Sequence, residues 1–581
     1  MDKNIWYIHG SMADYELSHR DGQYYIRYCL GKLKKPEFQP FTSERDPEKE
    51  ALRIAGSFKL KKGLMAVVIG AGNIKLIEHL KIQQVENGGD ILVFESDFKL
   101  YQGIKKIIPE LYNQVNVISQ ENFADLTEFV GNCTLESMLG YRFLPHSRAY
   151  QIDPGFYTEM ENRFKSLFSI RFSDLLTRIE FEARWILNGL LNLPRFLNAI
   201  PVKAVFDKAK GENALLISSG PGLREALPWL KKNQKKYFIA CVDSAYRVLA
   251  RSKITPHLIF TLDSQIFTWK HFQGLPCGEP GKFPVLYADL VSNPVAVRNW
   301  KGNILAGMTA HYTDTKRDVT PGCDFIEEEF FRNTCGDLQS GGSVATSLFD
   351  LLRNMNFSTI TLLGQDLAFT NREIHCTGTH HTDIWVSKNI NRLESFENIN
   401  NKVLKKRHIV WGKSMKGAPL PEDYIFSIYR KWFEESIATV PVKVMNAGMD
   451  GAKIRGTKPL VVPDREFSEK FAEKISKVVF SDSYDFIDVE KLKQFYNKVI
   501  EQKPQTDNLG FKDLKFMNRI GKKYFIKHLR NQMRKDGDYA GQETSADDLY
   551  LRLMEKERQV FWNILQKRIQ KYYRFINKDG F

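Results

Sequence analysis

The sequence lacks the features of several common protein classes. Its cysteines include no C-x-x-C pair and no zinc-finger spacing, which argues against structural zinc or a disulfide framework. No stretch approaches the roughly 18 apolar residues that a membrane helix needs, and the first residues lead into no apolar signal segment. We therefore expect a protein without a membrane span that stays in the reducing cytoplasm.

What is present indicates a large globular chain. Its 581 residues, at roughly 150 per domain, predict three or four domains. Hydrophobic residues make up 43% and charged residues 26%, which is close to the average for globular proteins. The formal net charge of +15 favours an acidic or phosphorylated partner without saying which one.

The first α/β pattern begins with the apolar run 64–69. The turn Gly70-Ala-Gly72 follows it, and a second strand over 91–95 ends on Glu95, at the spacing of a ribose-binding carboxylate in dinucleotide folds. The third glycine of that motif is missing, because Lys75 stands there. A plain strand–turn–helix connection is therefore favoured, and a methyltransferase site stays open. We predict a Rossmann-like N-terminal domain over residues 1–190.

A second α/β pattern follows a long amphipathic helix at 159–199. The strand 214–217 leads into the turn 218–222, and two further strands end at Asp243 and Asp263. Farther on, a strand over 358–363 closes at Gly364-Gln365-Asp366. Polar residues at successive strand ends mark the ligand edge of a doubly wound sheet. We predict a central domain over 191–463 with a largely parallel sheet.

Two glycine-rich turns in this domain are candidate anion sites. The segment Ser219-Gly220-Pro221-Gly222 lies where a strand passes into a helix, so its N–H groups would face a phosphate. It is not a P-loop, because no Gly-Lys-Ser/Thr follows. The segment Gly341-Gly342-Ser343 opens another helix with a hydroxyl beside it. Together the two turns would hold a nucleotide between them.

A loop with three histidines follows Asp366. His375, His380 and His381 are the side chains best matched to acid–base work near neutral pH. A metal site of His380 and His381 with Asp383 is an alternative, although these ligands are too close in sequence to complete a tetrahedral site alone.

Beyond residue 463 the strand signals stop and the sequence becomes helical and basic. Cations are interleaved with aromatic residues such as Phe516 and Tyr524, a pattern that single-stranded nucleic acid can bind. A packed apolar stripe with a solvated basic face explains the same pattern and is favoured. We predict a C-terminal helical domain over 464–581 for docking or structure, and no nucleic-acid partner.

Four segments in the central domain, in order, carry a resemblance to a known family. They look like the central domain of the motility-associated factor (Maf) flagellin glycosyltransferases, and the likeness extends through 444–454; the segments are Leu216–Leu223, Ile254–Asp263, Gly341–Thr346 and Leu363–Gly378. The resemblance implies transfer of a nonulosonic acid, of the pseudaminic or legionaminic type, from its CMP-activated form to Ser or Thr of flagellin. Such a transfer would serve flagellar assembly and motility.

The same segments are similar, more distantly, to bacterial sialyltransferases that use CMP-sialic acid without a metal. In those enzymes a glycine-rich turn cradles the nucleotide, two asparagines contact it and a histidine is the base. The matching positions are Ser219–Leu223, the pair Asp243 and Asp263, and His375. Gly222 replaces the usual serine, and the two aspartates replace asparagines, so each aspartate is expected to contact ribose or cytosine or to hold a cation.

The resulting prediction is an inverting glycosyltransferase with His375 as the general base. It requires no cofactor besides the CMP-sugar, and its dependence on a divalent metal is left open. The predicted donor-binding residues are Ser219, Gly220, Pro221, Gly222, Asp243, Ser244, Asp263, Gly341, Gly342, Ser343, Gln365 and Asp366.

Two other functions remain open. Small archaeal pterin pyrophosphokinases share the style of these motifs, and in that case Asp263 and Asp366 would hold Mg²⁺ against ATP. The chain would otherwise be a non-catalytic flagellin-binding or assembly factor whose nucleotide pocket is vestigial.

Overall fold

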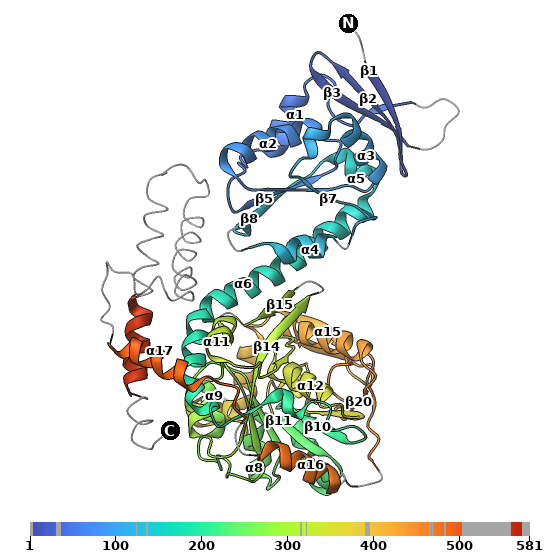
Figure 1. Cartoon of the computed structure of the whole chain (residues 1–581). Helices are drawn as coiled ribbons and strands as arrows, with labels where there is room; N and C mark the ends of the chain where they lie inside the picture. Colours follow the sequence, from blue (N-terminus) through green and yellow to red (C-terminus); the bar gives the residue numbers. More distant parts are fainter. Residues whose placement is uncertain are drawn as a thin grey trace. The chain divides into compact units, whose positions relative to one another are not determined.

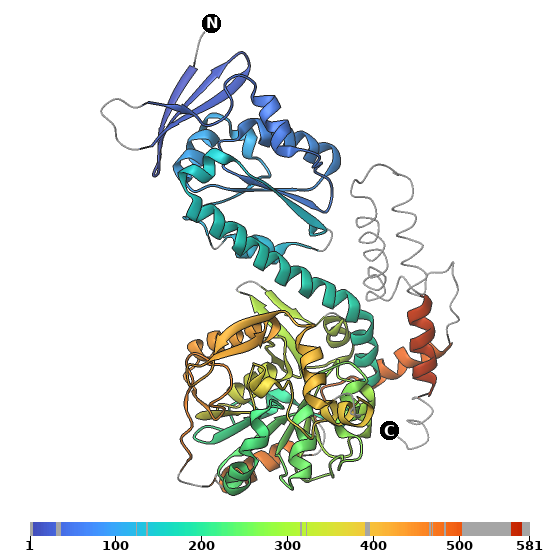
Figure 2. The same ribbon diagram turned by 180° about the vertical axis from the view of Figure 1, so that it is seen from behind.

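The computed structural model forms two compact units (Figures 1 and 2), the first covering Met1–Glu180 and the second beginning at Phe181. It describes residues 4–30, 37–123, 125–134, 137–313, 316–320, 322–389, 395–463, 466, 469–481, 484–501 and 559–571. The predicted α/β, multidomain class is confirmed. The division between the units falls inside a long helix, ten residues before the predicted boundary at 190.

The first unit contains an antiparallel sheet and a parallel sheet. The antiparallel sheet has the order β1-β2-β3-β4, and the parallel sheet has the order β7-β6-β5-β8. The strands are β1 (Asn4–His9), β2 (Asp14–Arg20), β3 (Gln23–Cys29), β4 (Gln39–Pro40), β5 (Leu64–Ile69), β6 (Asp90–Phe94), β7 (Asn116–Ile118) and β8 (Gly140–Leu144). The helices are α1 (Pro47–Ala55), α2 (Ile74–Asn87), α3 (Phe98–Ile107), η1 (Pro109–Tyr112), α4 (Asp125–Asn132), α5 (Ser147–Ile152) and the start of α6 (Pro154–Phe196).

The glycine turn of the first unit is closed by its own acidic residue. Glu95 directly follows β6, is 2% exposed, and accepts hydrogen bonds from the N–H groups of Ala71 at 2.7 Å and Asp97 at 2.9 Å. The ring of Phe41 lies against Gly72, where a Cβ atom would come within 2.7 Å of it. Burial raises the pKa of Glu95 to about 7. These contacts support the plain strand–turn–helix interpretation of this segment.

The second unit is built on a large, mostly parallel sheet. Its strand order is β15-β14-β13-β12-β11-β10-β17-β20-β21, with β9 and β16 also pairing with β14. A separate hairpin joins β18 to β19. The strands are β9 (Ile200–Pro201), β10 (Asn213–Ile217), β11 (Phe238–Val242), β12 (Leu258–Thr261), β13 (Val285–Asp289), β14 (Ile304–Thr313), β15 (Lys316–Val319), β16 (Asp337–Leu338), β17 (Thr359–Leu363), β18 (Ile409–Lys413), β19 (Pro419–Asp423), β20 (Lys443–Asn446) and β21 (Lys458–Pro459).

Helices follow most of these strands along the chain, as expected for a parallel sheet. They are η3 (Val202–Val205), α7 (Gly222–Asn233), η4 (Gln234–Lys236), α8 (Asp243–Arg251), α9 (Phe267–Phe272), α10 (Pro294–Asn299), α11 (Cys323–Phe330), α12 (Val344–Asn354), η5 (Thr370–Arg372), α13 (His380–Asn389), α14 (Phe396–Leu404), α15 (Tyr424–Thr439), α16 (Glu469–Val479) and α17 (Val489–Glu501). All five residues of β11 and of β13 are buried, which is typical of strands covered on both faces.

The order of the strands fixes where a ligand crevice belongs. β10, the first long strand of this sheet, lies between β11 and β17. The chain runs outward from β10 through β11, β12, β13 and β14, and then returns to β17 on the other side. Doubly wound sheets bind ligands at such a switch point, outside the carboxyl ends of the strands. A ligand crevice is therefore expected at the carboxyl ends of β10 and β17.

The described C-terminal helices join the core of the central sheet. Phe471 of α16 contacts the rings of Phe238 and Phe357 at centroid distances of 5.9 and 5.8 Å. Ile475 of α16 and Val499 of α17 belong to the same buried cluster as the strands. The described part of 464–581 thus has no core of its own, unlike the separate domain that we expected. The basic segment with Phe516 and Tyr524 lies outside the described residues.

This shared core predicts that α16 stabilises the second unit. Ile475 is 1% exposed, so Ile475→Ala should lower the free energy of unfolding by about 2–5 kcal/mol. Urea denaturation followed by circular dichroism measures this change. Ile425→Ala, which truncates a 43% exposed side chain, is the control and should change little. Equal stability of the Ile475→Ala variant and the wild-type protein would contradict a shared core.

Candidate functional site

The ends of β10 and β17 are tied together by backbone and carboxylate hydrogen bonds. The N–H of Gly220 donates to the carbonyl of Gly364 at 2.9 Å, and the N–H of Gly222 donates to Asp366 Oδ2 at 3.0 Å. The Ser218 hydroxyl also donates to the side-chain oxygen of Gln365. The predicted residues Gly220, Gly222, Gln365 and Asp366 are therefore brought together at the switch point.

Glycine is required in this turn because the carboxylate lies so close. A Cβ atom on Gly220 would come within 2.0 Å of Asp366 Oδ2, and one on Gly222 would come within 2.7 Å of Asp366 Oδ1. Real Cβ atoms do not approach oxygen so closely, so any side chain here would push Asp366 out of place. The sequence pattern Gly-Pro-Gly thus serves the close approach of β17 to the start of α7.

Asp366 takes the place at the helix N-terminus that we expected a phosphate to fill. The carboxylate is 3% exposed, and it uses the N–H of Gly222, while the N–H of Gly220 is used by Gly364. Burial raises the pKa of Asp366 to about 6, because loss of water outweighs the hydrogen bond from Gly222. A phosphate at this turn would have to displace this carboxylate.

The second glycine turn is used mainly to cap α12. The N–H groups of Gly341 and Ser343 donate to the Thr346 hydroxyl at 3.0 and 3.2 Å, and that of Gly342 donates to Ser340 Oγ at 3.1 Å. The Ser343 hydroxyl in turn accepts the N–H of Thr346, which makes a capping box. The predicted anion-binding N–H groups of this turn are therefore occupied within the segment 340–346.

A chain of hydroxyls connects the end of β11 to His375. The Ser244 hydroxyl donates to Ser219 Oγ at 2.9 Å, and Ser219 Oγ lies 3.5 Å from His375 Nδ1, which is long for a hydrogen bond. The N–H of Cys376 donates to the carbonyl of Ser219 at 2.8 Å and so fixes the loop beside the turn. The predicted residues Ser219, Ser244 and His375 thus meet in space.

Asp243 holds the Ser244 end of this chain of hydroxyls in place. Its carboxylate accepts the N–H of Ser244 at 2.7 Å and the hydroxyl of Thr261 at 2.8 Å. The side chain is 4% exposed, and burial raises its pKa to about 7, with a further contribution from the charge of Asp263. Asp243 therefore orients Ser244 and, in this structure, is itself nearly hidden from a ligand.

His375 is one member of a cluster of histidines. Its ring stacks on His381 at a centroid distance of 5.1 Å and an angle of 17°, and His381 lies 5.2 Å from His271. Burial lowers the pKa of His375 to about 4 and that of His271 to about 3, and it also lowers the pKa values of His380 and His381. At neutral pH the ring of His375 is therefore uncharged, and its surroundings disfavour the imidazolium form.

His271 was missed by the sequence analysis. It lies on α9, the short helix that follows β12 and Asp263, and its only signal was a histidine in the aromatic segment 267–272. Asp263 itself is exposed, and its charge favours protonation of His381 against the effect of burial. The predicted strand end at Asp263 therefore contributes to the site through its effect on His381.

The proposed metal alternative finds little support in these contacts. Asp383 pairs with Arg251 at 2.8 Å and lies 3.9 Å from Arg247. Within the described parts of the chain, no three His, Cys, Asp or Glu side chains are grouped so that they could hold a metal ion.

Across the same residues, no helix is both long and apolar enough to cross a membrane.

Comparisons with known proteins show which folds this chain resembles. A family model described as "6-hydroxymethylpterin diphosphokinase MptE-like" matches residues 187–372. The solved structure of a MAf glycosyltransferase from Magnetospirillum magneticum AMB-1 is similar at 13% identity and a TM-score of 0.55, covering 96% of this chain and 91% of that chain. No curated protein matches. The fold of this chain is thus like that of a Maf glycosyltransferase, whereas the likeness to sialyltransferases stays a prediction.

The low pKa of His271 predicts a pH-dependent stability. Burial is the main cause of this low pKa, and His375, His380, His381 and Arg247 around the ring also oppose its protonation. Its pKa is depressed on folding, so it stabilises the fold above about pH 6.5, and this contribution is lost as the pH falls toward 3.

His271→Gln removes this titration. The stability difference between wild type and variant should shrink by up to about 2 kcal/mol between pH 7.5 and 5, as measured by urea denaturation at each pH. A wild-type pH profile retained by His271→Gln would contradict the assignment.

Proposed function

We propose that the chain is a glycosyltransferase that moves a nonulosonic acid, of the pseudaminic or legionaminic type, from its CMP-activated form to Ser or Thr of flagellin. The observation that supports this function is a neutral histidine, His375, beside the hydroxyls of Ser219 and Ser244 at the switch point of a Maf-like fold. The proposed place of action is the cytoplasm, before flagellin is exported.

The proposed reaction is an inverting displacement. As the acceptor hydroxyl attacks the anomeric carbon, His375 takes its proton, and the bond to CMP breaks with its electron pair going to the phosphate oxygen. A hydroxyl near neutral pH needs such a base, and the Nδ1 atom of His375 lies 3.5 Å from the Ser219 hydroxyl at this edge of the sheet. The transferred sugar passes through a flat, charge-deficient state, so no covalent carboxylate partner is needed. No cofactor is proposed besides the donor.

The donor would lie along the carboxyl edge between β10, β11 and β12. The Ser219 hydroxyl accepts the hydrogen bond of Ser244 and keeps its own proton for the donor, and Asp263 is exposed for a sugar or base contact. The remaining proposed donor-binding residues are Gly220, Pro221, Gly222, Asp243, Gly341, Gly342, Ser343, Gln365 and Asp366. Because Asp366 now covers the turn, we infer that donor binding is accompanied by protonation or displacement of its carboxylate.

A second candidate function is ATP-dependent diphosphate transfer to a pterin. It is favoured by the match of residues 187–372 to the MptE-like family model. In that case Asp263 and Asp366 would hold Mg²⁺ against the triphosphate. The two functions differ in nucleotide and in metal dependence, so ligand binding separates them.

A thermal-shift panel with CMP, CTP, ATP with Mg²⁺, and S-adenosylmethionine, each with and without EDTA, tests the proposal. A ligand at 100 times its dissociation constant stabilises the folded protein by roughly 2.7 kcal/mol. Stabilisation by CMP or CTP that survives EDTA is the expected result. Stabilisation by ATP with Mg²⁺ alone would favour the pterin kinase, and S-adenosylmethionine alone would favour a methyltransferase. No response would favour a non-catalytic flagellin-binding factor.

His375→Ala should lower turnover of the CMP-sugar by about 10²–10⁴ while the fold survives, because a general base contributes on that scale. Mass spectrometry of flagellin after incubation with donor measures the transfer. His79→Ala, on the first unit, is the matched control and should keep wild-type turnover. If His375→Ala turns over normally, His380 or His381 becomes the candidate base.

A further inference from the structure

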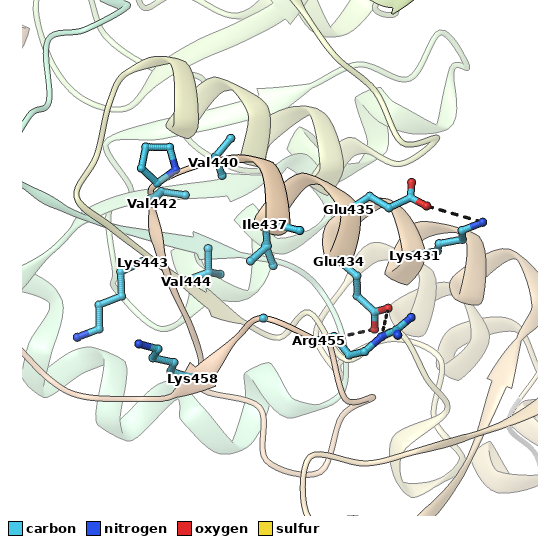
Figure 3. A pocket seen from close by; sticks show the side chains of 13 residues that line it. Lys431, Glu434, Glu435, Ile437, Val440, Val442, Lys443, Val444, Arg455 and Lys458 are labelled. Carbon is cyan, nitrogen blue, oxygen red and sulfur yellow. Dashed lines mark hydrogen bonds and ion pairs between the residues drawn. The ribbon is translucent and has the colours of Figure 1, made fainter. Parts of the chain in front are cut away.

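A pocket of about 730 Å³ lies at the outer edge of the large sheet in the second unit (Figure 3). It is lined by the last turns of α15, by the start of β20, and by residues 455–458, which lead into β21. Its size is in the range of ligand-binding cavities. None of its lining residues belongs to the proposed donor site, which lies at the carboxyl ends of the strands.

The two ends of this pocket differ in charge. At one end Glu434 is paired with Arg455 at 2.8 Å and with Arg430 at 3.2 Å, so its charge is balanced. Figure 3 shows Lys443 and Lys458 away from that ion pair. Neither lysine ammonium has an ion pair or hydrogen bond among the residues that the structure describes. This end therefore offers two positive charges to a ligand.

The wall between the two ends is apolar. It is formed by Ile437 of α15, by Val440 and Val442 of the following loop, and by Val444 of β20. Ile437 and Val444 are buried, whereas Val440 and Val442 are half-buried and partly open to solvent. A ligand that fits must combine aliphatic groups with negative charge.

The edge of the sheet is open beside this pocket. β21 pairs only with the last two residues of β20, at Met445–Lys458 and Asn446–Pro459. Within the described chain, the first two residues of β20, Lys443 and Val444, have no strand neighbour on that side. Extended peptides bind at open sheet edges, where a neighbouring pocket can take every second side chain of the peptide.

We propose that this pocket binds an extended, acidic segment of a protein. Successive side chains of an extended peptide point to opposite sides, so a segment that alternates aliphatic and acidic residues can place valine-like groups on Val440 and Val442. Its carboxylates then reach Lys443 and Lys458. That this partner is the acceptor of glycosylation rests on the proposed function. The binding itself does not rest on it.

Binding is tested on the full chain with a fluorescein-labelled hexapeptide of alternating valine and glutamate, and with its valine–lysine counterpart. Fluorescence anisotropy at constant ionic strength measures the dissociation constants. The double variant Lys443→Glu/Lys458→Glu should bind the glutamate peptide at least about tenfold more weakly than wild type and should gain affinity for the lysine peptide. Wild-type binding by this variant would overturn the proposal.

The matched control reverses two exposed lysines on α7, Lys231→Glu/Lys232→Glu, and so changes the net charge equally. It should bind both peptides as the wild type does, and an equal loss there would identify unspecific attraction instead. Val440→Ser should weaken binding of the glutamate peptide without changing its preference over the lysine peptide. If free glutamate or phosphate displaces the peptide as well as unlabelled peptide does, the site takes small anions and the proposal is wrong.

Turnover keeps this proposal separate from the proposed function. Peptide binding is measured without donor sugar. If the wild-type protein binds the peptide but does not use a CMP-sugar, the proposed function is wrong and the peptide-binding proposal still holds. Conversely, if the wild-type protein glycosylates flagellin but does not bind the peptide, the peptide-binding proposal is wrong and the proposed function still holds. If both proposals hold, Lys443→Glu/Lys458→Glu should raise the KM for flagellin and leave kcat unchanged.

Discussion

The second unit depends on the carboxylate of Asp366 lying against the N–H of Gly222. This hydrogen bond joins the segments that follow two neighbouring parallel strands, β10 and β17, and its two residues are 144 positions apart in the sequence. It requires glycine at two positions of the turn, since a Cβ atom on either would collide with the carboxylate. It also decides the chemistry of the switch point, because the most favourable anion position of α7 is already held by the protein.

The first unit uses the same arrangement. There the carboxylate of Glu95, at the end of β6, accepts the N–H of Ala71 in the turn that follows β5. In both units a buried acid from the neighbouring strand satisfies a backbone donor at a strand-to-helix turn, where an unpaired N–H would be costly. A glycine-rich turn after a strand therefore does not by itself indicate a nucleotide site, because the fold can supply its own anion.

Much of the fold could be predicted from local patterns. The strands expected to end at Asp243 and Asp263, and the strand expected over 358–363, correspond to β11, β12 and β17 within two residues at each of those ends. Buried parallel strands are short apolar runs that end in polar residues, and such runs are visible without knowing the fold. The helix expected from 159 to 199 is the single helix α6, and Pro194 stands in its last turn.

The rest depends on contacts between distant segments, which a single sequence does not record. Nothing near Phe471 indicates that it packs on Phe238, so the C-terminal helices were expected to form their own domain. Nothing near His271 indicates that it meets His381. The candidate site residues could be named because strand ends gather at one edge, but their hydrogen-bond partners, above all Asp366 on Gly222, came only from the three-dimensional arrangement.

Buried acids at strand ends have a thermodynamic consequence. The pKa values of Asp243, Asp289 and Glu95 are each raised to about 7, and that of Asp366 to about 6. These values lie close enough to neutral pH that an event which changes the surroundings of such a group moves protons to or from the solvent. The heat of ligand binding will therefore include the ionisation heat of the buffer. Calorimetry in phosphate and in Tris, compared at one pH, would count the protons exchanged when the sheet edge is occupied.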